Sequence, residues 1–127
     1  MSTNPETTRL LEILLKDDQL MKETVENLYY AGTDFDSKFS ISYELEHWFI
    51  GMYFNLWYWL NDRKQQMPHR VMQMALDVGS LWRVEWSQLA PAVYEYASYH
   101  LVNEDLVYPE QFDNKPAFMY NELEVIA

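Results

Sequence analysis

Glu44 and His47 form a Glu-x-x-His element, the spacing that places a carboxylate and an imidazole on one face of a helix. Dinuclear iron and manganese sites in helical bundles use two such elements and two further glutamates. The other histidines, His69 and His100, have no glutamate three residues before them. Because the ligand set is incomplete, the sequence predicts no metal site and an ordinary helical role for His47. His100 and Glu104 have the spacing of a common surface contact on a helix.

Motifs for covalent and phosphate chemistry are missing from this sequence. It contains no cysteine, no Gly-x-Ser-x-Gly turn and only three scattered glycines, which excludes thiol catalysis, a serine elbow and a glycine-rich phosphate loop. Paired carboxylates such as Glu104 and Asp105 occur, but acid–base catalysis usually needs a large cleft that small helical bundles seldom have. We therefore expect a protein that is not an enzyme and that uses no cofactor.

Acidic and tyrosine side chains are interleaved in the final third of the chain. Residues 91–127 contain seven carboxylates, five of the ten tyrosines and a single lysine, Lys115. Such a surface suits a basic protein partner, because carboxylates steer the encounter while tyrosine rings act as rigid anchors. The alternative is a solvated acidic surface that only keeps the protein soluble. The residues expected to bind a partner are Glu95, Tyr99, Glu104, Asp105, Tyr108, Glu110 and Asp113.

The whole chain carries 20 acidic and 9 basic side chains, a formal net charge of −11 at pH 7. This charge disfavours direct binding to nucleic acid and to anionic membranes. In size, acidity and lack of cofactor motifs the chain resembles phage-encoded anti-restriction and anti-CRISPR proteins and the acidic immunity proteins that neutralise nuclease toxins. The resemblance is one of composition, so it transfers no residue by position. It implies an inhibitor that occupies the basic surface of a nucleic-acid-binding enzyme or nuclease.

Two other functions fit the same sequence. One is a structural or adaptor protein that self-associates as a homodimer through its tryptophan-rich segment, and the other is a di-metal or small-ligand binding bundle. The opening residues, Met1 to Glu6, lack the basic and apolar regions of a signal peptide, and the absence of cysteine is compatible with a reducing compartment. These features favour a cytoplasmic protein.

The hydrophobic pattern predicts an all-α fold, a compact single domain over residues 1–127 with about five or six helices around a central aromatic-rich helix. The apolar run from Trp48 to Leu60 belongs to that central helix and is too short to cross a membrane. The central helix is expected to be capped by Ser40 or Ser42 and to end near Gln66.

Periodicity and capping residues place the other helices on either side of the central one. In the first of them, Leu10, Leu11, Leu14 and Leu15 form the apolar stripe. The segment from Gly32 to Ser40 suits a loop or, alternatively, a short edge strand. The remaining helices are expected at 4–16, which starts with Asn4 and Pro5, at 17–31, with Gly32 as its stop, and at 91–103, with Pro91 in its first turn. A further helix is expected at 69–86 despite Gly79, because its apolar stripe continues to Leu81 and Trp82. Residues 117–125 are expected to form a short helix or a docked tail.

Overall fold

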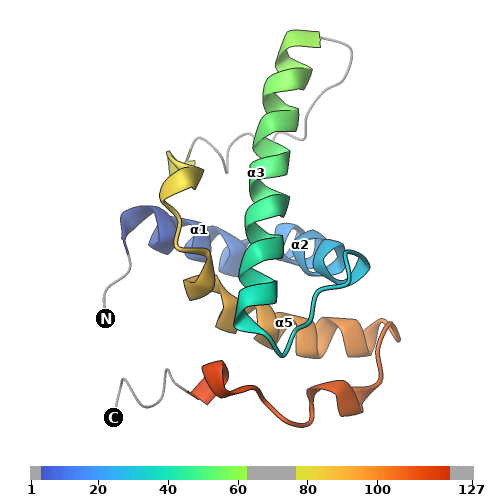
Figure 1. The fold of residues 1–127 in the computed structure, drawn as a ribbon. Coiled ribbons are helices and arrows are strands. Elements are labelled where there is room, and N and C mark those ends of the chain that lie inside the picture. The colour runs from blue at the N-terminus through green and yellow to red at the C-terminus, as the bar shows by residue number, and fades with distance from the viewer. Residues whose placement is uncertain (1–3, 63–76, 121–127) are drawn as a thin grey trace.

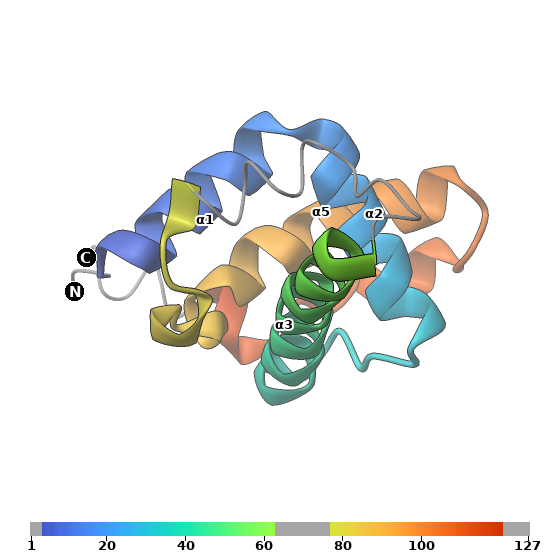
Figure 2. The same ribbon diagram turned by 90° about the horizontal axis from the view of Figure 1, so that it is seen from above.

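The computed structural model describes residues 4–62 and 77–120, and the side chains of residues 4–51 and 77–120. Every regular element in these ranges is helical, which confirms the predicted all-α class. In Figure 1, α3 stands steeply across α1, α2 and α5, and Figure 2 shows it nearly end-on beside them. The elements are α1 (Pro5–Lys16), α2 (Asp18–Tyr30), α3 (Lys38–Asp62), η1 (Leu81–Arg83), η2 (Trp86–Leu89), α5 (Ala90–Asn103) and η3 (Pro109–Phe112), the η elements being 3₁₀-helices.

A cap and two prolines mark where the first and last long helices begin. The Asn4 side chain accepts a hydrogen bond from the Thr7 backbone N–H at 2.9 Å and so caps α1, and Pro5 follows at the first helical position. The Asn4 amide also donates to the Arg83 carbonyl at 2.7 Å, which ties this cap to η1. At the other end of the fold, Pro91 lies in the first turn of α5. Both helix starts agree with the sequence prediction.

The core is built on the inward face of α3. Ile41, Leu45 and Phe49 recur every four residues and are completely buried. Phe49 stacks on Trp86 of η2, with ring centroids 5.8 Å apart. Trp48 donates its indole N–H to the Thr24 hydroxyl of α2 at 2.9 Å. These contacts fix α3 against α2 and η2, and the buried faces of α1, α2 and α5 complete the core.

The helix predicted for residues 69–86 is wrong in its second half. Residues 77–78 are helical, but Gly79 has φ of 87° and ends that helix, since glycine adopts this left-handed conformation without steric cost. Two short 3₁₀-helices, η1 and η2, follow in place of the predicted continuation. Trp82, assigned to the apolar stripe of that helix, is therefore 60% exposed. Residues 69–76 lie outside the described part of the chain.

Two smaller predictions also need correction. Leu15 is exposed, because the buried face of α1 is a narrow one made by Thr7, Leu10 and Leu14. The cap of α3 is Ser37 rather than Ser40 or Ser42, since the Ser37 hydroxyl accepts the Ser40 N–H at 3.1 Å.

The segment before α3 is a loop and contains no strand. Residues 117–120 are helical, whereas 121–125 lie outside the described residues. Of the apolar run from Trp48 to Leu60, the side chains after Gly51 also lie outside them. Within the described ranges, none of the helices combines the length and the apolar character that a membrane crossing requires.

Candidate functional site

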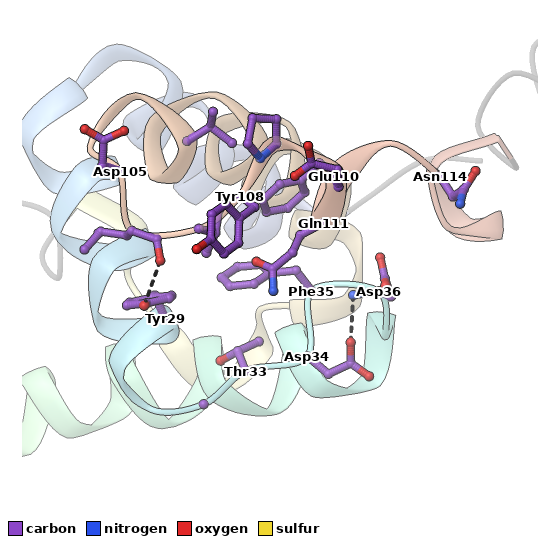
Figure 3. Close-up of a pocket in the computed structure, with 16 residues that line it drawn as sticks. Tyr29, Thr33, Asp34, Phe35, Asp36, Asp105, Tyr108, Glu110, Gln111 and Asn114 are labelled. Atoms are coloured by element: carbon purple, nitrogen blue, oxygen red, sulfur yellow. Dashed lines mark hydrogen bonds between the residues drawn. The ribbon is translucent and has the colours of Figure 1, made fainter.

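A groove of about 950 Å³ lies between two loops that are distant in the sequence. One wall is the loop 32–36 after α2, and the other is formed by Val102, residues 105–112 and Asn114, at the end of α5 and beyond it. Figure 3 shows carboxylates on both walls, Asp34 and Asp36 on one and Asp105 and Glu110 on the other. All four of these acidic residues are exposed, so the groove opens to solvent.

The first wall begins where α2 ends. The Thr33 N–H donates to the Leu28 carbonyl at 3.1 Å, and the Gly32 N–H donates to the Tyr29 carbonyl at 3.0 Å. This pair of hydrogen bonds is a Schellman motif, which requires a left-handed residue after the helix. Gly32 supplies it with φ of 82°. The stop predicted at Gly32 is therefore confirmed, and it turns the chain into the groove.

Hydrogen bonds around Asp34 shape the rest of this wall. The Asp34 N–H donates to the Ser40 hydroxyl, and one Asp34 carboxylate oxygen accepts the Asp36 N–H, both at 3.0 Å. The Asp34 carbonyl accepts the Ser37 N–H at the same distance. Asp34 thus fixes the loop through its own side chain, and this Asx-type turn places Asp36 next to it.

The second wall begins with a similar Schellman motif at the end of α5. The Asp105 N–H donates to the Val102 carbonyl at 3.0 Å, and the Leu106 N–H donates to the Leu101 carbonyl at 2.9 Å. The left-handed position is Asp105, with φ of 58°, where this motif usually has glycine or asparagine. Asp105 is the one residue other than glycine with positive φ among the described residues. The backbone there is strained, and the strained residue carries a carboxylate at the rim of the groove.

Aromatic side chains join the two walls and form the floor. The Tyr29 hydroxyl donates to the Leu106 carbonyl at 2.9 Å, a bond drawn in Figure 3. The Phe35 and Phe112 rings, one from each wall, lie 6.2 Å apart. Phe112 also meets the fully buried Tyr94 edge-on at 5.5 Å. The groove floor is therefore anchored directly to the core through α5.

All the charged residues in the described lining of the groove are acidic. Among the residues that the structure describes, its lining contains four acidic residues and no lysine or arginine. Burial, and then the nearby charges of Asp36 and Glu95, raise the pKa of Tyr94. The Tyr94 hydroxyl and the Thr33 hydroxyl, the latter in the groove wall, are buried without a hydrogen-bond partner among the described residues. A site of this kind can bind a cation that also makes contact with aromatic rings.

The seven residues predicted to bind a partner are divided by the structure. Asp105, Tyr108 and Glu110 line the groove. The other four are exposed but do not line it: Glu95 and Tyr99 lie on α5, Glu104 follows that helix, and Asp113 follows η3.

Sequence reasoning missed Asp34 and Asp36, which complete the groove. They lie in the segment Gly32 to Ser40, where two aspartates next to two phenylalanines were interpreted only as a loop or strand. Their pairing with a segment some 70 residues later depends on the packing of α2 against α5, which a single sequence does not reveal.

The two described histidines, which the sequence offered as possible metal ligands or contact residues, make hydrogen bonds to other helical residues. The His47 Nδ1–H faces the Tyr43 carbonyl at 3.0 Å, within α3. His100 was expected to contact Glu104, but its Nε2 instead meets the Glu26 carboxylate of α2 at 2.7 Å. The described residues contain no group of three or more histidine, aspartate or glutamate side chains placed to hold a metal ion.

Comparison with known protein families, with curated proteins and with solved structures finds nothing that matches this chain.

Proposed function

We propose that this protein is a non-enzymatic inhibitor that binds a basic surface of a nucleic-acid-binding protein, with one arginine or lysine side chain of that partner entering the groove. The composition of the groove carries this proposal: its described lining combines four acidic residues from two separate loops with aromatic residues and includes no lysine or arginine. A guanidinium or ammonium group gains from both kinds of neighbour. Nucleic-acid-binding proteins present such groups in clusters because they bind phosphates.

Arginine fits the groove better than lysine. Its planar guanidinium has five N–H donors and stacks on aromatic rings, whereas the ammonium of lysine is a compact point charge. The carboxylates of Asp36, Asp105 and Glu110 are acceptors for these donors, and the Thr33 hydroxyl offers a further oxygen without a partner among the described residues. Tyr108, 79% exposed, lies in the same lining and offers a ring face.

The conformation of Asp105 also supports a binding role. Glycine at this position would remove the cost of a left-handed backbone, which is on the order of 1 kcal/mol. Strain of this kind often persists where a side chain is needed for function. A carboxylate at this position gives the second wall its negative charge next to Glu110.

Exposed acidic residues outside the groove would steer the encounter. Glu95, Glu104 and Asp113 lie on or beside α5 and η3, and Tyr99 is exposed on the same helix as Glu95. Long-range attraction of this sort speeds association and weakens as salt is added. The result would be occlusion of a phosphate-binding surface in the cytoplasm, the mode of action expected for anti-restriction, anti-CRISPR and nuclease-immunity proteins.

The test is a quantitative pull-down with the full chain, followed by nucleic-acid competition on the purified partner. The groove variant is Asp36→Asn with Glu110→Gln. The matched control is Glu12→Gln with Glu85→Gln, which removes the same charge at exposed positions away from the groove. We expect the wild type and the control to capture the same nucleic-acid-binding protein and to displace its nucleic acid, and the groove variant to bind it about tenfold more weakly. Equal binding by both double variants, or a partner without a basic surface, would contradict the proposal.

A further inference from the structure

The groove is larger than the single side chain that the proposed function places in it. Its volume is about 950 Å³. If each non-hydrogen atom needs the ~30 Å³ that a water molecule occupies in the liquid, the seven such atoms of an arginine side chain take roughly 200 Å³. Pockets that hold a whole small ligand measure about 300–1,000 Å³. Most of the groove is therefore open to further residues of the partner chain.

The acidic residues of the groove are divided equally between its two walls. Asp34 and Asp36 belong to the loop after α2, and Asp105 and Glu110 belong to the segment after α5, as Figure 3 shows. The Asp36 N–H donates to one Asp34 carboxylate oxygen at 3.0 Å, which holds the first pair on one loop. A cation held by one pair leaves the other pair without a counter-charge, because no described lysine or arginine lines the groove.

The backbone of the second wall suits an extended ligand. Tyr108, which lines the groove, has φ of −78° and ψ of 144°, an extended conformation just before η3. Its carbonyl accepts the Gln111 N–H at 3.1 Å, whereas its own N–H has no acceptor among the described residues. An extended backbone with an available N–H can pair with a second extended chain through main-chain hydrogen bonds.

An extended chain in the groove would present its side chains to both walls. Successive side chains of such a chain point to opposite sides, and every second side chain points to the same side. Two adjacent arginines would therefore place one guanidinium at each wall. Two arginines separated by one residue would place both at the same wall, where the like charges repel each other.

We propose that the groove binds an extended segment of its partner that carries two adjacent arginine residues, one facing each acidic wall. This inference rests on the proposed function and adds a second cation to the one proposed there. The Thr33 hydroxyl, buried in the first wall without a partner among the described residues, is a further acceptor on that side. Arginine is favoured where proteins bind phosphates, so neighbouring arginines are in keeping with a nucleic-acid-binding partner.

The test is a titration of the full chain with short peptides capped at both ends, followed through the NMR amide signals of residues 32–36 and 105–112. Three peptides are compared: Ala-Arg-Arg-Ala, its isomer Arg-Ala-Arg-Ala, and Ala-Arg-Ala-Ala. The two isomers have the same charge and composition, so a difference between their affinities reports the spacing of the arginines. We expect the adjacent pair to bind about fivefold more tightly than the single arginine, and the spaced isomer to stay within about twofold of the single arginine.

Variants of the two walls show where each arginine binds. Asp36→Asn removes a charge from the first wall and Glu110→Gln removes one from the second, whereas Glu12→Gln removes the same charge from α1 and is the matched control. We expect either groove variant to lower the preference for the adjacent pair over the single arginine to about twofold. The control should keep the preference of the wild type.

The outcomes separate this inference from the proposed function. Equal binding of the two isomers in the groove, or tighter binding of the spaced one, would overturn the inference and leave the proposed function standing, because a cation would still enter the groove. If no peptide shifts the signals of the groove, the proposed function fails together with the inference. The same holds if Asp36→Asn with Glu110→Gln binds all three peptides as tightly as the wild type.

Discussion

The groove and the exposed side of α3, where Phe39, Tyr43, Glu46 and His47 lie, both present exposed aromatic rings, but they differ in charge. The described lining of the groove combines aromatic residues with four acidic residues and includes no lysine or arginine. The described part of the exposed side of α3 carries a single carboxylate, that of Glu46, beside the Phe39 and Tyr43 rings. Aromatic side chains favour contact with many kinds of protein, so the charges around them decide which partner is attracted. From this difference in charge we expect the two surfaces to attract different partners.

Salt should separate the two surfaces most strongly. Between about 0.05 and 0.5 M salt, we expect association of a basic partner with the groove to slow by about tenfold or more, because screening weakens the long-range attraction. Association between two copies of the chain, through the exposed side of α3 or elsewhere, should instead strengthen with salt, since the same screening reduces repulsion between two chains of charge −11. Stopped-flow kinetics measures the first quantity and sedimentation velocity the second. The same response to salt in both measurements would contradict the contrast.

Two phenylalanine substitutions test whether the groove floor contributes more to the free energy of unfolding than the exposed side of α3. Phe112→Ala removes a ring that packs against Phe35 and the buried Tyr94, and we expect it to lower the free energy of unfolding by about 2 kcal/mol. Phe39→Ala removes a ring that is 78% exposed, and its effect should stay within about 0.5 kcal/mol. Urea unfolding of the two variants measures both values. A larger loss for Phe39→Ala than for Phe112→Ala would show that the floor of the groove is not part of the core.

The two Schellman motifs allow a matched test within the groove itself. Asp105→Gly relieves a left-handed backbone, so we expect about 0.5–1 kcal/mol of added stability together with weaker binding of a basic partner. Gly32→Asp creates the opposite change at the end of α2 and should cost on the order of 1 kcal/mol. A Cβ at Gly32 would meet no atom within 4 Å, so this cost reports the backbone alone. If Asp105→Gly instead destabilises the protein, the Asp105 side chain has a structural role.

Sequence predicted the features of this molecule that depend on near neighbours. Asn4 with Pro5, the stop at Gly32 and Pro91 in the first turn of α5 each act within one helical turn, and all three are confirmed. Gly79 shows the limit of such rules, because glycine is tolerated inside some helices and ends others. The apolar stripe after it predicted a continuous helix, whereas the backbone turns at Gly79 and the chain continues as 3₁₀-helices.

Only one wall of the groove was predicted from the sequence, because the other wall joins it through long-range packing. Asp105, Tyr108 and Glu110 belong to a segment whose acidity is visible in the sequence, so they could be singled out. Asp34 and Asp36 become part of the same site only because α2 and α5 pack side by side and both end at the same edge of the molecule. His100 illustrates the same point, since its partner Glu26 comes from α2 and not from the neighbouring turn of α5.

The smallest expected effect concerns the contact between the two helices whose ends form the groove. The Tyr96 hydroxyl of α5 donates to an Asp18 carboxylate oxygen of α2 at 3.1 Å. Burial, and then this hydrogen bond and the Asp18 charge, raise the pKa of Tyr96 to about 12. A tyrosine in the unfolded chain titrates near about 10, so the folded protein keeps a proton that the unfolded chain releases. The stability gained from the contact is therefore complete below a pH of about 10 and is lost as the pH rises through about 12.

Tyr96→Phe should make stability less dependent on pH over that alkaline range. We expect urea unfolding between about pH 9 and 12 to show a shallower loss of stability for Tyr96→Phe than for the wild type. Tyr108→Phe is the matched control, because Tyr108 is 79% exposed and its ring lies in the groove lining instead of between the helices. Its profile should follow that of the wild type. Identical profiles for all three proteins would mean that the Tyr96 contact does not hold α2 and α5 together, and the two walls of the groove would then depend on apolar packing and on the Tyr29 hydrogen bond to Leu106.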